Sequence, residues 1–274
     1  MTLLASWVGI DTHGPSSIYI ASDSRISWGS KEKYDYGRKV FALKHSPDIF
    51  GYCGDVLFPS LVLSQILEMA DSSLLFDQGS SSETRFNSVK EKLIYQFSKY
   101  PNEVETITDE TIEVLHASRD PVHMNRFTCN LLKWTRKAGW QSSTIELPKK
   151  SGPLFVRGCG AQEFEDNFAR YKKGPNAETS RNVFHCFCDS LFNTKEPTVG
   201  GAPQLAGLIR KPASTGIYYG IIARGRRYYL GAPVDRLSGF DHLVWRNELF
   251  ERCDGQTGKR KADAQPQPNL TTRS

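Results

Sequence analysis

Apolar residues along the first 55 positions fall into short runs separated by turn-like segments. The runs at 3–10 and 17–23 carry β-branched and aromatic residues and flank DTHGPS, a composition typical of a turn. After a charged segment, SKEKYDYG, two more runs at 39–43 and 49–54 are separated by HSPD. The chain is therefore predicted to begin with four strands.

The apolar period changes after Asp55. In the segments 57–70 and 84–100, apolar residues recur every three or four positions, which predicts two amphipathic helices. Alternating strand-like runs, two further helical patterns and more strands follow. These later elements are predicted as strands at 111–118, 126–135, 139–148 and 153–160, helices at 161–173 and 177–193, strands at 200–211, 215–225 and 226–233, and a short helix at 243–253.

This order of elements predicts an α+β fold in which two sheets pack face to face with helices outside them, a four-layer α-β-β-α sandwich. We find no internal repeat of 20–50 residues. One domain is expected over residues 1–253. Residues 254–274, rich in Gln, Pro, Asn and Thr with GKRK at 258–261, are expected to form a disordered basic tail.

The composition narrows the class of protein. The net charge of +5 is mild, and the basic GKRK cluster has no interleaved aromatic residues, so nucleic-acid binding is not favoured. No apolar run approaches the roughly 18–20 residues that span a membrane, and the N-terminal stretch lacks the basic region of a signal peptide. We therefore expect a soluble, cytoplasmic protein without a membrane partner.

The six cysteines are scattered and form no CxxC pair. His185, Cys186 and Cys188 in VFHCFCDSLF have two interpretations: a metal clip, or the packing of a helix into the core. A zinc site needs a second ligand pair at a suitable spacing, and none is evident. Core packing is favoured, and we expect neither a metal nor another cofactor.

The N-terminus carries a candidate nucleophile, because Thr2 follows the initiator methionine. If Met1 is removed, Thr2 has a hydroxyl and a free α-amine. An α-amine has an ordinary pKa of about 7.7–8.0, which suits a general base near neutral pH. An N-terminal threonine therefore contains both its nucleophile and its base. A small residue at position 2 is also common in proteins without this chemistry.

The segments DSRISWG, YGRKVFAL and GYCGD that follow give Thr2 its context. Together with Gly158-Cys159-Gly160 and EPTVGG (196–201), they resemble the β-subunits of proteasomes and their bacterial relatives, in the N-terminal-nucleophile (Ntn) hydrolase superfamily. The resemblance runs over roughly residues 2–225 and is strongest in 17–60. It implies Thr2 as nucleophile, Lys39 beside its hydroxyl, and Asp23 holding Lys39.

The resemblance also implies supporting residues. Arg25 would be structural, backbone N–H groups near Gly54 would stabilise an oxyanion, Cys159 would be a hydrogen-bond partner of the terminal amine, and Glu196 would occupy the family's acidic position. The chain departs from the family here, because the family has serine at Cys159 and aspartate at Glu196. Val199 replaces a further serine, with Thr198 beside it as a substitute, and the first hairpin is longer than usual.

Each residue also has an interpretation without catalysis. Asp23 could cap a turn, Arg25 could be a surface charge, and Lys39 could extend from an edge strand to solvent. Their shared order and spacing favour the catalytic interpretation.

Three functions follow from the resemblance. The favoured one is a threonine-type peptidase that cleaves peptide or protein substrates inside a ring-shaped or helical homo-oligomer, with an ATP-dependent unfoldase as a candidate partner. The alternatives are a catalytically silent structural subunit and an Ntn amidase acting on a small molecule. Because no propeptide precedes Thr2, the chain is expected to be closer to the propeptide-less bacterial relatives.

Overall fold

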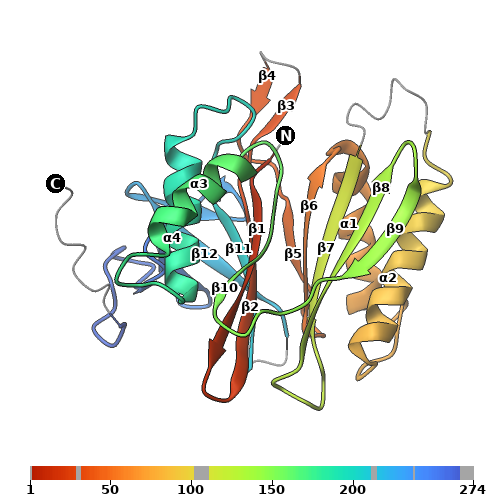
Figure 1. Cartoon of the computed structure of the whole chain (residues 1–274), viewed down its shortest axis with the longest axis horizontal. Helices are drawn as coiled ribbons and strands as arrows, with labels where there is room; N and C mark the ends of the chain where they lie inside the picture. The colour runs from red at the N-terminus through yellow and green to blue at the C-terminus, as the bar shows by residue number, and fades with distance from the viewer. Residues whose placement is uncertain (1, 29–31, 102–110, 211–214, 237, 266–274) are drawn as a thin grey trace.

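The computed structural model describes residues 2–28, 32–101, 111–210, 215–236 and 238–265 (Figure 1). Its larger sheet has nine strands, and all neighbouring pairs except β12 and β15 are antiparallel. Its main path runs β10 (Gly152–Arg157), β1 (Leu4–Asp11), β2 (Gly14–Ser22), β11 (Gln204–Ile209), β12 (Ile217–Ala223), β13 (Arg226–Tyr229) and β14 (Ala232–Pro233).

The second sheet is a five-stranded antiparallel meander. It consists of β5 (Val40–Ala42), β6 (Asp48–Gly54), β7 (Thr111–Arg119), β8 (Phe127–Thr135) and β9 (Gly139–Thr144). A separate two-stranded hairpin consists of β3 (Ile26–Trp28) and β4 (Glu32–Tyr34), for which the sequence predicts no strand, and β4 lies within the charged segment SKEKYDYG. The polar composition of that segment hides the pairing, because Glu32, Lys33 and Tyr34 are all exposed.

In the described part of the chain, the four helices cover the outer faces of the sheets (Figure 1). Helices α1 (Leu57–Asp71) and α2 (Ser82–Phe97) lie on the five-stranded sheet, whereas α3 (Ala161–Tyr171) and α4 (Ser180–Asn193) lie on the nine-stranded sheet. The prediction of an α+β fold is confirmed. Capping residues define two of the helix starts: Ser81 accepts a hydrogen bond from the Thr84 amide, and Thr179 from the Asn182 amide.

Three clusters of buried apolar residues separate these groups of elements. One lies between the nine-stranded sheet and α3 and α4, and contains Trp7 and Phe184; another lies between the five-stranded sheet and α1 and α2, around Phe58. The third, with Leu4 and Leu115, lies between the sheets. Alternate residues of β1 thus enter different clusters, because successive strand side chains point to opposite faces.

The C-terminal region differs from its prediction. Residues 243–253 form β15 (Val244–Asn247) and β16 (Arg252–Cys253) instead of a short helix. Strand β15 extends the sheet by pairing in parallel with β12, and Trp245 is buried there. The Asn247 side chain accepts hydrogen bonds from the amides of Leu249 and Glu251, which closes a turn between the strands.

The chain remains ordered beyond residue 253, where the sequence predicts the tail to begin. Cys253 forms a bridge with Arg260, and Ala264 is buried. The guanidinium of Arg227 donates to the carbonyls of Gly255 and Gln256. Residues 254–265 therefore have defined contacts with the preceding chain, residues 266–274 lie outside the described residues, and the domain boundary at 253 stays a prediction. Among the described helices, none is long and apolar enough to cross a membrane.

The long first hairpin keeps both its ends close together. Strands β1 and β2 pair from Leu4 opposite Ser22 to Asp11 opposite Gly14, so the additional residues lengthen the strands rather than a loop. The Asp23 amide then donates to the Leu3 carbonyl at 3.1 Å. This pairing places the residue before β1 beside the residue after β2.

Candidate active site

Thr2, Asp23 and Lys39 meet at one end of the molecule, and none of them has exposed surface. Lys39 Nζ donates to Thr2 Oγ1 at 2.9 Å and to Asp23 Oδ1 at 2.8 Å. The three residues therefore form one buried polar cluster. Its geometry is that of a hydroxyl beside an ammonium, which in turn is held by a carboxylate.

The two sheets bring these residues together. Thr2 lies two residues before β1 and Asp23 directly follows β2 in the nine-stranded sheet, whereas Lys39 directly precedes β5 in the other sheet. The Lys39 carbonyl accepts a hydrogen bond from the Tyr52 amide, which fixes the lysine backbone beside β6. The cluster thus lies where the two sheets face each other at the start of β1.

The Asp23 carboxylate is bound by backbone donors as well as by Lys39. Oδ1 accepts from the Leu3 amide at 3.1 Å, and Oδ2 accepts from the amides of Gly200 at 3.1 Å and Arg25 at 3.3 Å. A buried carboxylate is strongly destabilising unless it is paired and hydrogen-bonded. Both of its oxygens have donors, so the charge is compensated and its position is fixed.

The Lys39 ammonium uses all three of its donors. Besides Thr2 and Asp23, it donates to the Arg25 carbonyl. The fully buried Gln204 side chain accepts from the Lys39 amide and donates to the Asp23 and Gly37 carbonyls. Sequence reasoning did not identify Gln204, because it lies 165 residues from Lys39 and belongs to no local motif.

Arg25 joins the β3–β4 hairpin to the loop that follows α4. Its guanidinium forms two hydrogen bonds with Asp35, at 2.6 and 2.8 Å, and donates to the carbonyls of Pro197 and Val199. The Arg25 guanidinium lowers the pKa of the Asp35 carboxyl, and the hydrogen bond with Asp35 raises the pKa of Arg25. This loop carries Gly200, so Arg25 positions one of the donors to Asp23.

The turn Gly158-Cys159-Gly160 contacts Thr2 through its backbone. The Gly160 amide donates to the Thr2 carbonyl at 3.3 Å. Gly158 has φ +92°, and a Cβ there would lie 1.9 Å from the Thr2 carbonyl oxygen, so only glycine fits. Cys159 between them is exposed, the one exposed cysteine of the six.

The two remaining predicted residues are Glu196 and Gly54. Glu196 accepts from the amide and hydroxyl of Thr198, at 3.0 and 2.7 Å, and these hydrogen bonds lower its pKa. Gly54, at the end of β6 with φ +90°, has Thr111 as its nearest neighbour. An oxyanion role for the backbone near Gly54, an amine-binding role for Cys159 and a supporting role for Glu196 stay predictions.

No metal-binding arrangement of three or more His, Cys, Asp or Glu side chains occurs in the part of the chain that the structure describes. Cys186 and Cys188 are buried in the cluster beneath α4, and the His185 ring lies edge-on against Tyr171. These positions agree with the core-packing interpretation of the HCFC segment.

Neither a protein-family model nor a curated protein matches the sequence. Among solved structures, Anbu (ancestral beta-subunit) from Yersinia bercovieri is similar with a TM-score of 0.53 and 11% identity, over 77% of this chain and 85% of that one. Thiobacillus denitrificans BPH has a TM-score of 0.47 and 14% identity, over 77% and 100%. Eukaryotic HslV from Trypanosoma brucei has 0.45 and 7%, over 75% and 99%.

These identities are low, so the similarity to Anbu concerns the fold alone. The resemblance to proteasome-like Ntn hydrolases that the sequence motifs indicate is therefore confirmed at the level of the fold.

Proposed function

We propose that this chain is an N-terminal threonine hydrolase with the four-layer Ntn sandwich, which cleaves amide bonds, with peptides as its substrates. Thr2 is the nucleophile, and its α-amine becomes free when Met1 is removed. The observation that supports this proposal is the hydrogen bond from Lys39 Nζ to Thr2 Oγ1 at 2.9 Å, together with the Asp23–Lys39 ion pair at 2.8 Å.

The reaction uses only groups of the chain, the substrate and water. The free α-amine takes the Thr2 hydroxyl proton, and Oγ1 attacks the carbonyl carbon of the scissile amide. The amine passes that proton to the leaving nitrogen, the C–N bond breaks, and an ester on Thr2 remains. Water then attacks the ester, which releases a carboxylate product and restores the hydroxyl.

Lys39 and Asp23 have separate roles in this scheme. The Lys39 ammonium, 2.9 Å from Oγ1, stabilises the negative charge that develops on that oxygen as its proton leaves. Asp23 does not contact the substrate and acts as a positioning residue for Lys39. Donors near Gly54 stabilise the oxyanion of the tetrahedral intermediate.

The protein is further proposed to act in the cytoplasm as a ring-shaped or helical homo-oligomer, with an ATP-dependent unfoldase as a candidate partner. Sedimentation velocity of the full chain tests the first part: a species of many subunits is expected, and a monomer at micromolar concentration contradicts it.

A silent structural subunit is the second candidate. It is favoured by the burial of Thr2, which has no exposed surface. A nucleophile must be reached by its substrate, so this candidate predicts that Thr2 never reacts.

Intact-mass measurement of the purified protein, alone and after incubation with a peptide epoxyketone, decides between the two. A mass short by one methionine and a single adduct are expected. The adduct should be absent in Thr2→Ala and retained in Thr12→Ala, in which the substituted threonine is exposed in the turn between β1 and β2. Retained Met1 without an adduct supports the silent subunit, and an adduct that persists in Thr2→Ala refutes the nucleophile assignment.

A further inference from the structure

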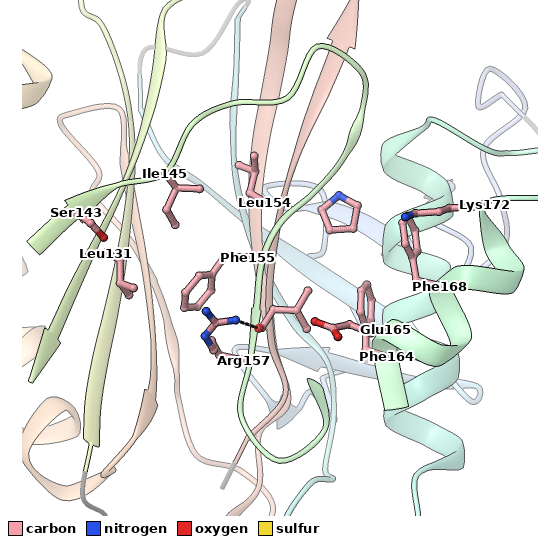
Figure 2. A pocket seen from close by; sticks show the side chains of 12 residues that line it. Leu131, Ser143, Ile145, Leu154, Phe155, Arg157, Phe164, Glu165, Phe168 and Lys172 are labelled. Atoms are coloured by element: carbon pink, nitrogen blue, oxygen red, sulfur yellow. Dashed lines mark hydrogen bonds between the residues drawn. The ribbon is translucent and has the colours of Figure 1, made fainter. Parts of the chain in front are cut away.

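A groove with a volume of about 680 Å³ runs along the outer edge of β10, between the two sheets and α3 (Figure 2). This volume is in the range of ligand-binding pockets. Polar and apolar side chains both line it, and the apolar ones include Leu131, Ile145, Leu154, Phe155, Phe164 and Phe168. They come from β8, the segment after β9, β10 and α3, so the groove exists only in the folded chain.

Strand β10 has an unpaired edge along this groove. Among the described strands it pairs only with β1, and the register shifts between Ser6, opposite Phe155, and Trp7, opposite Pro153. The shift leaves Leu154 as an additional residue in the strand, and such bulges redirect side chains. An edge strand offers backbone donors and acceptors to an extended peptide, and the adjacent groove can receive its side chains.

Arg157 lies at the end of β10 that is nearest to Thr2. It pairs with Leu4 and is followed by Gly158, which contacts the Thr2 carbonyl. Its guanidinium lies over the Phe155 ring, 4.9 Å from the centroid, and Nη1 donates to the Val156 carbonyl at 2.9 Å (Figure 2). The side chain is nevertheless 53% exposed. It is thus a cation that is held in place and still open to a ligand.

The charges around Arg157 leave a positive excess. The nearest carboxylate, Glu113, forms an ion pair with Lys133 at 2.9 Å, whereas Arg157 Nε is 4.0 Å from it. Two cations therefore share one carboxylate at this end of the groove. The rim formed by α3 adds Glu165 and Lys172, which offset each other. A guanidinium with unused donors binds a carboxylate well.

We propose that this groove binds an extended segment of the substrate peptide, with apolar side chains along β10 and an acidic side chain on Arg157. The groove would lead such a segment toward Thr2. Only the cleavage of the bound peptide rests on the proposed peptidase function, because binding itself requires no turnover.

The test measures binding in the Thr2→Ala variant, so that hydrolysis cannot interfere. The probes are two fluorescein-labelled heptapeptides with leucine on both sides of the central residue, which is glutamate in one and glutamine in the other. The glutamate peptide is expected to bind about fivefold more tightly at low salt, with a smaller ratio at high salt. In Arg157→Ala the ratio should fall to about one, and Arg157→Lys should retain part of it.

Two further variants separate the contribution of the Arg157 charge to peptide binding from that of the groove. Arg252→Ala removes a similarly exposed arginine that pairs with Asp263 near the C-terminus, and it should leave the ratio unchanged. Leu154→Glu places a carboxylate in the groove and should weaken the binding of both peptides. Weakening by Leu154→Glu together with the loss of the ratio in Arg157→Ala supports the proposal.

Three results would overturn it. They are equal binding of the two peptides, a glutamate preference that survives Arg157→Ala, and a change of oligomeric state in Arg157→Ala without any peptide binding, which would mean that a second copy covers the groove. The proposed peptidase function is judged separately by the epoxyketone adduct on Thr2. Arg157-dependent binding without an adduct would support the proposal for the groove and contradict the proposed peptidase function.

Discussion

Two fully buried carboxylate–cation clusters stand at opposite ends of β6, and they differ in what their cations do. In the first, Lys39 donates to Asp23 and to the Thr2 hydroxyl. In the second, Asp48 lies 2.7 Å from His116 Nε2 and 2.7 Å from Arg85 Nε. Asp48 begins β6, while the Lys39 carbonyl is bonded near its other end, at Tyr52.

Further contacts hold the second cluster in place. The Arg85 guanidinium also donates to the Ser118 hydroxyl, at 2.6 Å, and to the Arg119 and Ser80 carbonyls. The His116 ring is stacked between the rings of Phe50 and Phe86, with centroids 4.4 and 5.7 Å away. This cluster links α2 to β6 and β7, and that is a structural task.

The comparison shows that buried charge alone does not indicate catalysis. Both clusters satisfy the rule that buried ions must be paired. The first differs because its cation also donates to the hydroxyl of Thr2, where removal of Met1 creates a free amine. Matched substitutions in the two clusters should therefore separate activity from stability.

Lys39→Met is expected to have the largest effect, because it should reduce both turnover and stability. The variant removes the ammonium from Thr2 Oγ1 and leaves the Asp23 carboxylate buried without its cation. We expect turnover to fall by about a thousandfold or more and the free energy of unfolding to fall by about 3–5 kcal/mol. Peptidase assays and urea unfolding measure the two; a stable variant with normal turnover would contradict the role of Lys39.

Arg85→Met should reproduce only the loss of stability. It leaves Asp48 without its guanidinium partner, so unfolding should become easier by a similar amount, about 3–5 kcal/mol. The fraction that stays folded should keep its turnover and its epoxyketone adduct, since Arg85 has no contact with Thr2, Asp23 or Lys39. Loss of turnover in a folded Arg85→Met protein would show that the two clusters are coupled.

The first cluster is predicted from the sequence because Asp23 and Lys39 lie in the short motifs DSRISWG and YGRKVFAL, which resemble those of proteasome β-subunits. No such motif covers the second cluster. Asp48, Arg85 and His116 belong to three separate elements, and only their packing joins them. Gln204 and Asp35 were missed for the same reason, because their contacts with the site are long-range or lie in a hairpin of polar residues.

Local composition also explains the errors near the C-terminus. The segment 243–253 has spaced apolar residues that fit a helix, but its partner, β12, is distant in sequence. Pairing with β12 and burial of Trp245 outweigh the local pattern. Similarly, the polar residues after 253 are held by Arg227 and by backbone bonds that no local signal reveals.

Gly158→Ala probes the contact of the first cluster with the Gly158-Cys159-Gly160 turn. An alanine Cβ would lie 1.9 Å from the Thr2 carbonyl oxygen, so Thr2 must shift relative to Lys39. A misplacement of this kind is expected to reduce kcat/KM by about tenfold to a hundredfold.

Gly14→Ala is the control, because Gly14 has nearly the same φ, +94°, with no atom within 4 Å of the added Cβ. It should change stability by about 1–2 kcal/mol and leave kcat/KM unchanged. Equal kinetic effects in the two variants would mean that backbone strain, and not contact with Thr2, causes the loss.

The smallest expected effect is the pH dependence of stability that the second cluster imposes. Hydrogen bonding and charge from His116, together with the charge of Arg85, outweigh the burial of Asp48 and lower the pKa of its carboxyl. A carboxyl with a lowered pKa in the folded state stabilises the protein above its unfolded pKa of about 3.9. That contribution is lost as pH falls through the folded pKa. The urea midpoint of the unaltered protein should therefore fall more steeply than that of Asp48→Asn between roughly pH 5 and pH 3. Parallel curves for the two proteins would mean that Asp48 has the same proton affinity folded and unfolded, and that the second cluster contributes packing without a net electrostatic gain.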